Sequence, residues 1–167
     1  MPPGASSETL GVNWRRTVDR STRWPVILFI TSATFWLLAG SALALIASVK
    51  FQAPDWLVHQ GWLTFGRVRP AHLNTMIYGW ISMAGISVGT WLWARLLKTR
   101  LRGGSLMIAS AILWNIGMVL GTIGILIGHS RAIEWVEMPY YAFAFIVRAI
   151  LVVATSFIKP LRVRRVK

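Results

Sequence analysis

The chain has 167 residues, of which 55% are hydrophobic and only 14% are charged, and its formal net charge is +13 at pH 7. A soluble domain keeps about a quarter of its residues charged, so this composition excludes an ordinary soluble fold and favours an integral membrane protein. The absence of cysteine excludes disulfides, thiolate metal sites, iron–sulfur clusters and covalently attached c-type haem.

The first part of the chain predicts a basic tail followed by one membrane span. Residues 1–23 are polar and basic, and we expect a disordered tail there. Residues 24–49 contain no charge and are long enough to cross the hydrocarbon core, which takes about 20 residues. Pro25 fits the first turn of this span, where a missing N–H costs little. Within the connector that follows, residues 56–63 are typical of a segment lying along the membrane surface.

Three more apolar stretches predict three further spans, over residues 71–97, 106–128 and 140–158. A short basic loop joins the second and third, and a basic tail, residues 159–167, closes the chain. We therefore predict an all-α fold in which residues 24–158 form a transmembrane bundle of four helices.

The distribution of basic residues predicts the topology. Thirteen of the 18 lysines and arginines lie in the two tails and in the region around the loop between spans two and three, counted from Arg95 to Gly104. By the positive-inside rule these segments face the cytoplasm, so both termini are cytoplasmic. Topology and contact with the lipid bilayer explain the net charge, and no RNA-binding signature or basic recognition helix favours nucleic acid. All three histidines then lie on or near the outward side.

His72 is the strongest candidate for a ligand. Pro70 is expected to begin the second span, which would place His72 in its first turn. Gly79 follows on the same helix face and would leave a flat gap beside the histidine, while Arg67 and Arg69 lie just outside the membrane. An imidazole above a small residue, with arginines suited to carboxylates nearby, indicates a haem b axial site with propionates above it. A histidine that only forms an interfacial hydrogen bond, and a glycine that only serves packing, explain the pattern equally simply.

Residues 65–77 read F-G-R-V-R-P-A-H-L-N-T-M-I and resemble the segment that opens the second helix of the haem–copper oxidases. The resemblance is strongest to the catalytic subunit I of cbb3-type cytochrome c oxidases, and it extends over about residues 25–158. It implies that His72 is an axial ligand of the low-spin haem b, with its iron, and that Arg67 and Arg69 lie near the haem propionates. It also associates an acidic residue before the fourth helix with calcium, and Glu134 or Glu137 matches that position loosely.

Members of that family carry many more helices, which supply the second haem ligand and the copper site. This sequence therefore resembles only the first part of a subunit I, and we expect a truncated or split subunit that does not reduce oxygen alone. The resemblance further implies the bacterial cytoplasmic membrane, respiratory electron transport, and as partners the remaining helices of subunit I and a c-type cytochrome subunit. The large subunit of nitric oxide reductase, from the same superfamily, is a sibling alternative.

An intramembrane arginine and a row of glycines are two further features of the predicted spans. Arg148 is an intramembrane charge in the fourth span, and its distance from the cytoplasmic end favours a side chain that faces the bundle rather than one that reaches the membrane surface. The third span carries four glycines on one face, which predicts a seam for close helix packing: Gly117, Gly121, Gly124 and Gly128.

Two alternatives to an oxidase portion stay open. His72 and His129 both lie near the outward ends of antiparallel spans, so they could ligate one haem in a stand-alone bis-histidine electron-transfer bundle. A non-catalytic membrane scaffold that binds no haem is the other possibility.

Overall fold

The structure is a computed structural model that describes residues 7–164, and side chains for residues 13–158 of these. Over the described range every regular element is helical. The elements are α1 (Ser7–Gln52), the 3₁₀ turn η1 (Gly61–Leu63), α2 (Phe65–Asn74), the π-helical η2 (Thr75–Ile81), α3 (Ser82–Leu96), α4 (Gly104–Leu126) and α5 (Tyr140–Arg164). The predicted all-α class is therefore confirmed.

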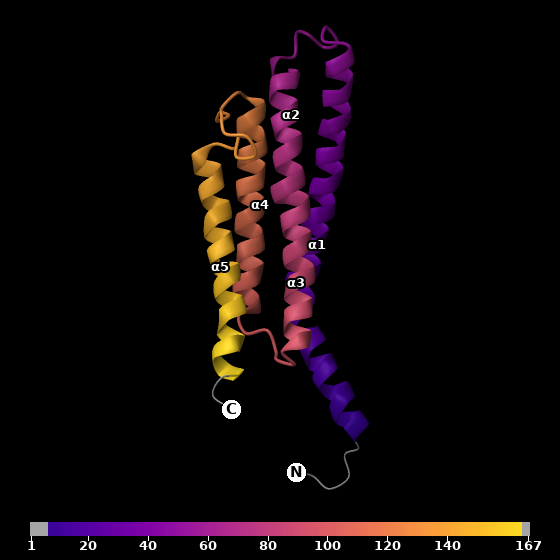
Figure 1. Cartoon of the computed structure of the whole chain (residues 1–167), viewed down its shortest axis with the longest axis vertical. Helices are drawn as coiled ribbons and strands as arrows, with labels where there is room; N and C mark the ends of the chain where they lie inside the picture. The colour runs from indigo at the N-terminus through magenta and orange to yellow at the C-terminus, as the bar shows by residue number, and fades with distance from the viewer. Residues whose placement is uncertain (1–6, 165–167) are drawn as a thin grey trace.

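The helices lie side by side along one long axis (Figure 1). Because α2, η2 and α3 follow one another without a break, they form one continuous rod, which packs against α1, while α4 packs against α5. Residues 53–64 and 127–139 lie at one end of the bundle, called here the loop end. The start of α1, the turn over residues 97–103 and the end of α5 lie at the other, called here the terminal end.

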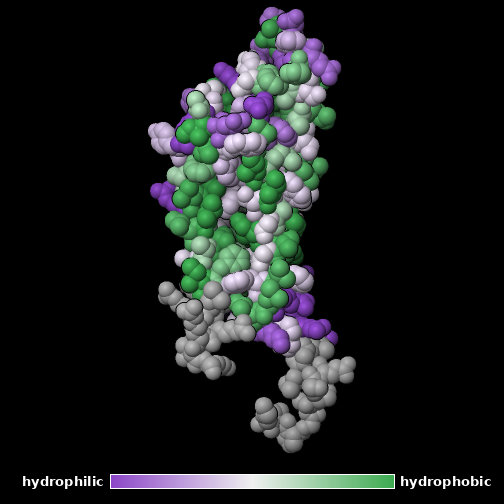
Figure 2. All heavy atoms as spheres, viewed as in Figure 1, coloured by the Kyte–Doolittle hydropathy of each residue, from purple (hydrophilic) through white to green (hydrophobic). Residues whose placement is uncertain are grey.

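Three helical stretches are long and apolar enough to cross a membrane: Asn13–Gln52, Gly104–Leu126 and Tyr140–Ile158. Many of their large apolar side chains point away from the bundle, including Leu38, Leu45 and Leu151. Figure 2 shows an apolar middle of the molecule with hydrophilic residues gathered toward its two ends. Such an apolar surface suits lipid rather than water.

The start of the chain differs from the sequence prediction. Residues 7–23, predicted as part of a disordered tail, are helical and continue into the first span, so Pro25 lies inside α1 rather than in its first turn. Tertiary packing explains the extension, because Val18 and Thr22 are buried and the Asp19 carboxylate forms a bidentate salt bridge with Arg95 of α3. Residues 1–6 of the predicted tail lie outside the described residues.

The start of the rod formed by α2, η2 and α3 also differs from the sequence prediction. Helix α2 begins at Phe65, so Pro70 lies within it and His72 lies about two turns from its start, not in its first turn. Three residues after His72 the hydrogen-bonding pattern widens to that of a π-helix. Segments of this kind are frequent at functional sites. Within this one, the Tyr78 carbonyl accepts a hydrogen bond of 2.9 Å from the Trp114 indole of α4.

The glycine seam of α4 forms close contacts, as predicted, at three of its four positions, with α5 and with the two residues that precede it. A Cβ at Gly117 would lie 2.9 Å from the Ile146 side chain, one at Gly121 2.5 Å from Met138, and one at Gly124 2.5 Å from Pro139. Gly128 belongs to a different feature. It lies beyond α4 with φ of +97°, a left-handed conformation that suits glycine at a helix C-terminus.

We predict that Gly121→Ala lowers the free energy of unfolding in detergent by about 1–3 kcal/mol, because the added methyl group overpacks a buried contact with Met138. Gly85→Ala is the matched control, since a Cβ there meets nothing within 4 Å. It should leave stability unchanged or raise it by about 0.5–1 kcal/mol through helix propensity. Thermal unfolding followed by circular dichroism measures both, and equal effects would contradict the seam.

Candidate functional site

The candidate site is built around His72 on α2 and its contact with α1. The His72 Nδ1 atom lies 2.8 Å from the backbone carbonyl oxygen of Gly40. Since a carbonyl oxygen only accepts, Nδ1 carries the proton and donates, which leaves the lone pair on Nε2. An outer hydrogen bond of this kind orients an imidazole for metal ligation. The residue as a whole is half-buried.

Close approach of α1 makes this contact possible. Gly40 is buried, and a Cβ there would lie 2.9 Å from both the Met76 Sδ and the Thr75 Oγ1. Thr75 is fully buried, and its hydroxyl donates back to the carbonyls of Ala71 and His72, at 3.0 and 2.8 Å. The backbone around His72 is thus packed against Gly40 of α1 and bonded by the Thr75 hydroxyl within its own helix.

Gly79 does not provide the flat gap that was predicted for a porphyrin. A Cβ at this position would lie 2.5 Å from the Trp36 Cβ of α1 and 3.1 Å from the Met118 Cε of α4. The space beside Gly79 is therefore filled by helix packing. The prediction was wrong because spacing along one helix does not reveal which neighbouring side chain occupies the opposite surface.

The two arginines before His72 lie in different environments. Arg67 is half-buried, and its Nη1 donates to the carbonyl of Leu126 at the C-terminus of α4, at 3.2 Å. A cation there also complements the negative end of the helix dipole. Arg69 is exposed, and its Nη2 lies 3.9 Å from the Glu134 carboxylate, a loose surface pair that contributes little to stability. Both guanidinium groups keep N–H donors for a further carboxylate.

A buried polar contact joins α2 to the segment before α5. Glu137 is 7% exposed, and its Oε2 accepts a hydrogen bond of 2.6 Å from the Asn74 amide nitrogen. The same amide group donates to the Pro70 carbonyl at 2.9 Å. Its oxygen, Asn74 Oδ1, is buried without a partner within the described part of the chain. Glu137 and Asn74 therefore place oxygen atoms together at α2, two residues along the helix from His72.

Other predicted site residues lie apart. His129 is exposed and follows the end of α4. Arg148 is exposed on α5, so none of the described helices covers it, and neither ion pair found among residues 13–158 includes it. Its predicted bundle-facing role, which included pairing with a partner helix outside this sequence, stays a prediction. The described residues contain no group of three or more histidine, cysteine, aspartate or glutamate side chains that could hold a metal ion.

Sequence reasoning missed Gly40 and Asn74. Gly40 is one of many small residues in an apolar span, and nothing local marks its pairing with a histidine 32 positions later. Asn74 did carry a signal, since an amide side chain inside an apolar span requires a hydrogen-bonding partner.

The fold and the site define an all-helical, multi-pass membrane protein that presents one oriented imidazole near the loop end, beside two arginines. The chain belongs to the family described as cytochrome c and quinol oxidase polypeptide I, whose pattern matches residues 24–167. The resemblance to the haem–copper oxidases is thereby confirmed.

Several bacterial relatives agree with this family. The chain is 26% identical over 130 residues to a cytochrome c oxidase subunit 1 homolog of Azorhizobium caulinodans, covering 76% of this chain and 24% of the relative. It is 26% identical over 110 residues to a bacteroid homolog of Bradyrhizobium diazoefficiens, covering 66% and 20%. It is 23% identical over 139 residues to the cbb3-type cytochrome c oxidase subunit CcoN1 of Stutzerimonas stutzeri, covering 83% and 29%. The chain thus spans less than a third of the length of these relatives.

We predict that Glu137→Ala lowers the free energy of unfolding by about 1–3 kcal/mol, because it removes one of the two acceptors of the buried Asn74 amide and leaves that N–H without a partner. Glu137→Gln keeps an oxygen acceptor and should recover part of the loss. Glu134→Ala is the control. It removes an exposed carboxylate and should change stability by less than about 0.5 kcal/mol, again measured by thermal unfolding in detergent. Equal losses for Glu134→Ala and Glu137→Ala would refute the buried contact.

Proposed function

We propose that these residues form the part of a membrane-bound respiratory oxidase that holds one side of a low-spin haem b, with His72 as an axial ligand to the haem iron. The observation that carries this proposal is the hydrogen bond from His72 Nδ1 to the Gly40 carbonyl, which orients the ring and leaves Nε2 free. Family membership supplies the expectation of haem. When bound, the haem would supply one-electron transfer.

The chain's own residues have defined tasks in this proposal. The Gly40 carbonyl sets the tautomer and orientation of the imidazole, and the Thr75 hydroxyl bonds the backbone carbonyl of His72. Arg67 and Arg69 offer guanidinium donors to the haem propionates, since both retain free N–H groups. For calcium, Glu137 is a better candidate than Glu134, because its carboxylate adjoins the unpartnered oxygen of Asn74.

The proposal includes a four-span topology with both termini in the cytoplasm of a bacterial inner membrane. The rod from Phe65 to Leu96 would be a span in addition to the three candidate spans, and it is the second in chain order. Its π segment divides it into shorter helices. The basic segments gather at the terminal end of the bundle, which supports a cytoplasmic location for that end. His72 then lies toward the outer leaflet.

Oxygen reduction needs groups beyond those found here. The second axial ligand and the copper site would come from helices that are not among these residues, and electrons would arrive from a c-type cytochrome subunit. This part of the protein would therefore act in electron transfer within a larger respiratory complex rather than alone.

Haem titration of the purified chain in detergent tests the proposal. We predict a shifted Soret band on addition of haem b and an alpha band after reduction with dithionite. His72→Ala should weaken haem binding by more than about tenfold, because loss of even an outer-shell partner typically lowers metal affinity that much.

His129→Ala is the control, since His129 is exposed beyond the end of α4. It should bind haem like the unmodified chain. Unchanged haem binding by His72→Ala would overturn the assignment of the ligand. Equal losses for the two variants would instead favour the two-histidine bundle.

A further inference from the structure

A second cluster of polar residues lies at the terminal end, far along the chain from His72. Arg16, Arg20 and Arg23 follow one another on α1 at intervals of four and three residues, which places them along one side of the helix. All three are exposed, and no carboxylate lies within ion-pair distance of them among the side chains of residues 13–158. Three unpaired positive charges therefore share about two turns of helix.

The nearby carboxylate, Asp19, is already neutralised. Its two oxygens accept hydrogen bonds from Arg95 of α3, at 2.8 Å from Nε and 2.7 Å from Nη2. The Trp91 indole also donates to Asp19, at 3.3 Å, and the Arg95 guanidinium lies 5.1 Å from the centre of the Trp91 ring. This arrangement holds α1 against α3 and leaves the three arginines as the net charge of the cluster.

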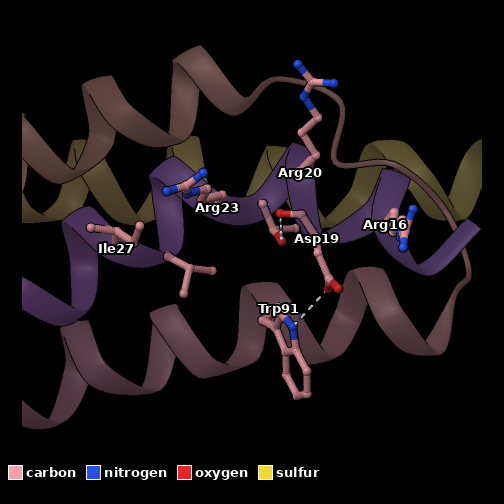
Figure 3. Close-up of a pocket in the computed structure, with 8 residues that line it drawn as sticks. Arg16, Asp19, Arg20, Arg23, Ile27 and Trp91 are labelled. Atoms are coloured by element: carbon pink, nitrogen blue, oxygen red, sulfur yellow. Dashed lines mark hydrogen bonds between the residues drawn. The ribbon is translucent and has the colours of Figure 1, made fainter. Parts of the chain in front are cut away.

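These residues line a cavity of about 640 Å³ between α1 and α3. Figure 3 shows Arg16 and Arg23 on either side of Asp19, with Trp91 reaching the same place from α3 and Ile27 further along α1. The cavity is thus cationic around Asp19 and Trp91 and apolar at the end formed by Val26 and Ile27. A smaller cavity of about 450 Å³ lies beside Arg20 and is lined by Arg100 as well.

We propose that this cavity is a binding site for an anionic phospholipid, with its phosphodiester among the α1 arginines beside Trp91 and its acyl chains along Val26 and Ile27. A free inorganic anion would use the arginines but not the apolar end. A zwitterionic lipid would use the apolar end but gain less from the unpaired charge. Basic pockets between membrane helices on the cytoplasmic side suit anionic headgroups, and the Trp24 and Trp91 rings suit the interface.

Native mass spectrometry of the full-length chain in detergent tests the proposal, with phosphatidylglycerol and phosphatidylcholine of identical acyl chains as probes. We expect phosphatidylglycerol to bind more tightly, and millimolar inorganic phosphate not to displace it. In R16Q/R23Q its affinity should fall about thirtyfold, as expected for two arginines near an anionic surface.

R15Q/R102Q is the matched control. It removes two exposed arginines from the same end of the molecule, neither of which lines the cavity. This variant should bind phosphatidylglycerol like the unmodified chain. Equal losses in the two variants, equal binding of phosphatidylcholine, or displacement by inorganic phosphate would each overturn the proposal. We expect both variants to fold, because only exposed side chains are changed, and unfolding temperatures measured in parallel check this.

Discussion

The close approach of α1 to the rod formed by α2, η2 and α3 is the constraint on which the rest of the structure depends. Two glycines permit it, one from each side. Gly40 makes room for Thr75 and Met76, while Gly79 makes room for Trp36. Because the backbones come this near, a main-chain carbonyl of α1 reaches the His72 ring directly. Larger side chains at either glycine would separate the helices and remove that contact.

The π-helical segment is the complement of this approach. In η2 the helical bonds widen to a spacing of five residues, as from the Ser82 N–H to the Ile77 carbonyl. The Tyr78 carbonyl accepts a hydrogen bond from the Trp114 indole, and the Tyr78 hydroxyl donates to the Trp135 carbonyl at 2.9 Å. The rod is thereby tied to α4 and to the loop before α5. Irregular backbone is tolerated at membrane depth when neighbouring groups satisfy it, as they do here.

Hydropathy and charge predicted the helices well, and the F-G-R-V-R-P-A-H segment predicted the family. The apolar blocks are independent of tertiary detail, so their existence could be read directly, as could the glycine seam of α4. Features that depend on partners distant in sequence could not. The helical start of α1 requires the pairing of Asp19 with Arg95, and the contents of the space beside Gly79 require Trp36. The helix propensity of residues 7–23 and the spacing of residues along one helix do not identify such partners.

The position of Arg148 has a consequence for how the chain enters the bilayer. An arginine at the centre of a membrane helix raises the free energy of insertion by about 2.5–3.5 kcal/mol on translocon scales. This side chain is exposed on α5, so the described helices do not cover it. The rest of α5 offsets that cost, because its mean hydropathy of 2.1 is the highest of the three candidate spans. We therefore expect α4 and α5, which pack closely at Gly117, to enter the bilayer together as a helical hairpin.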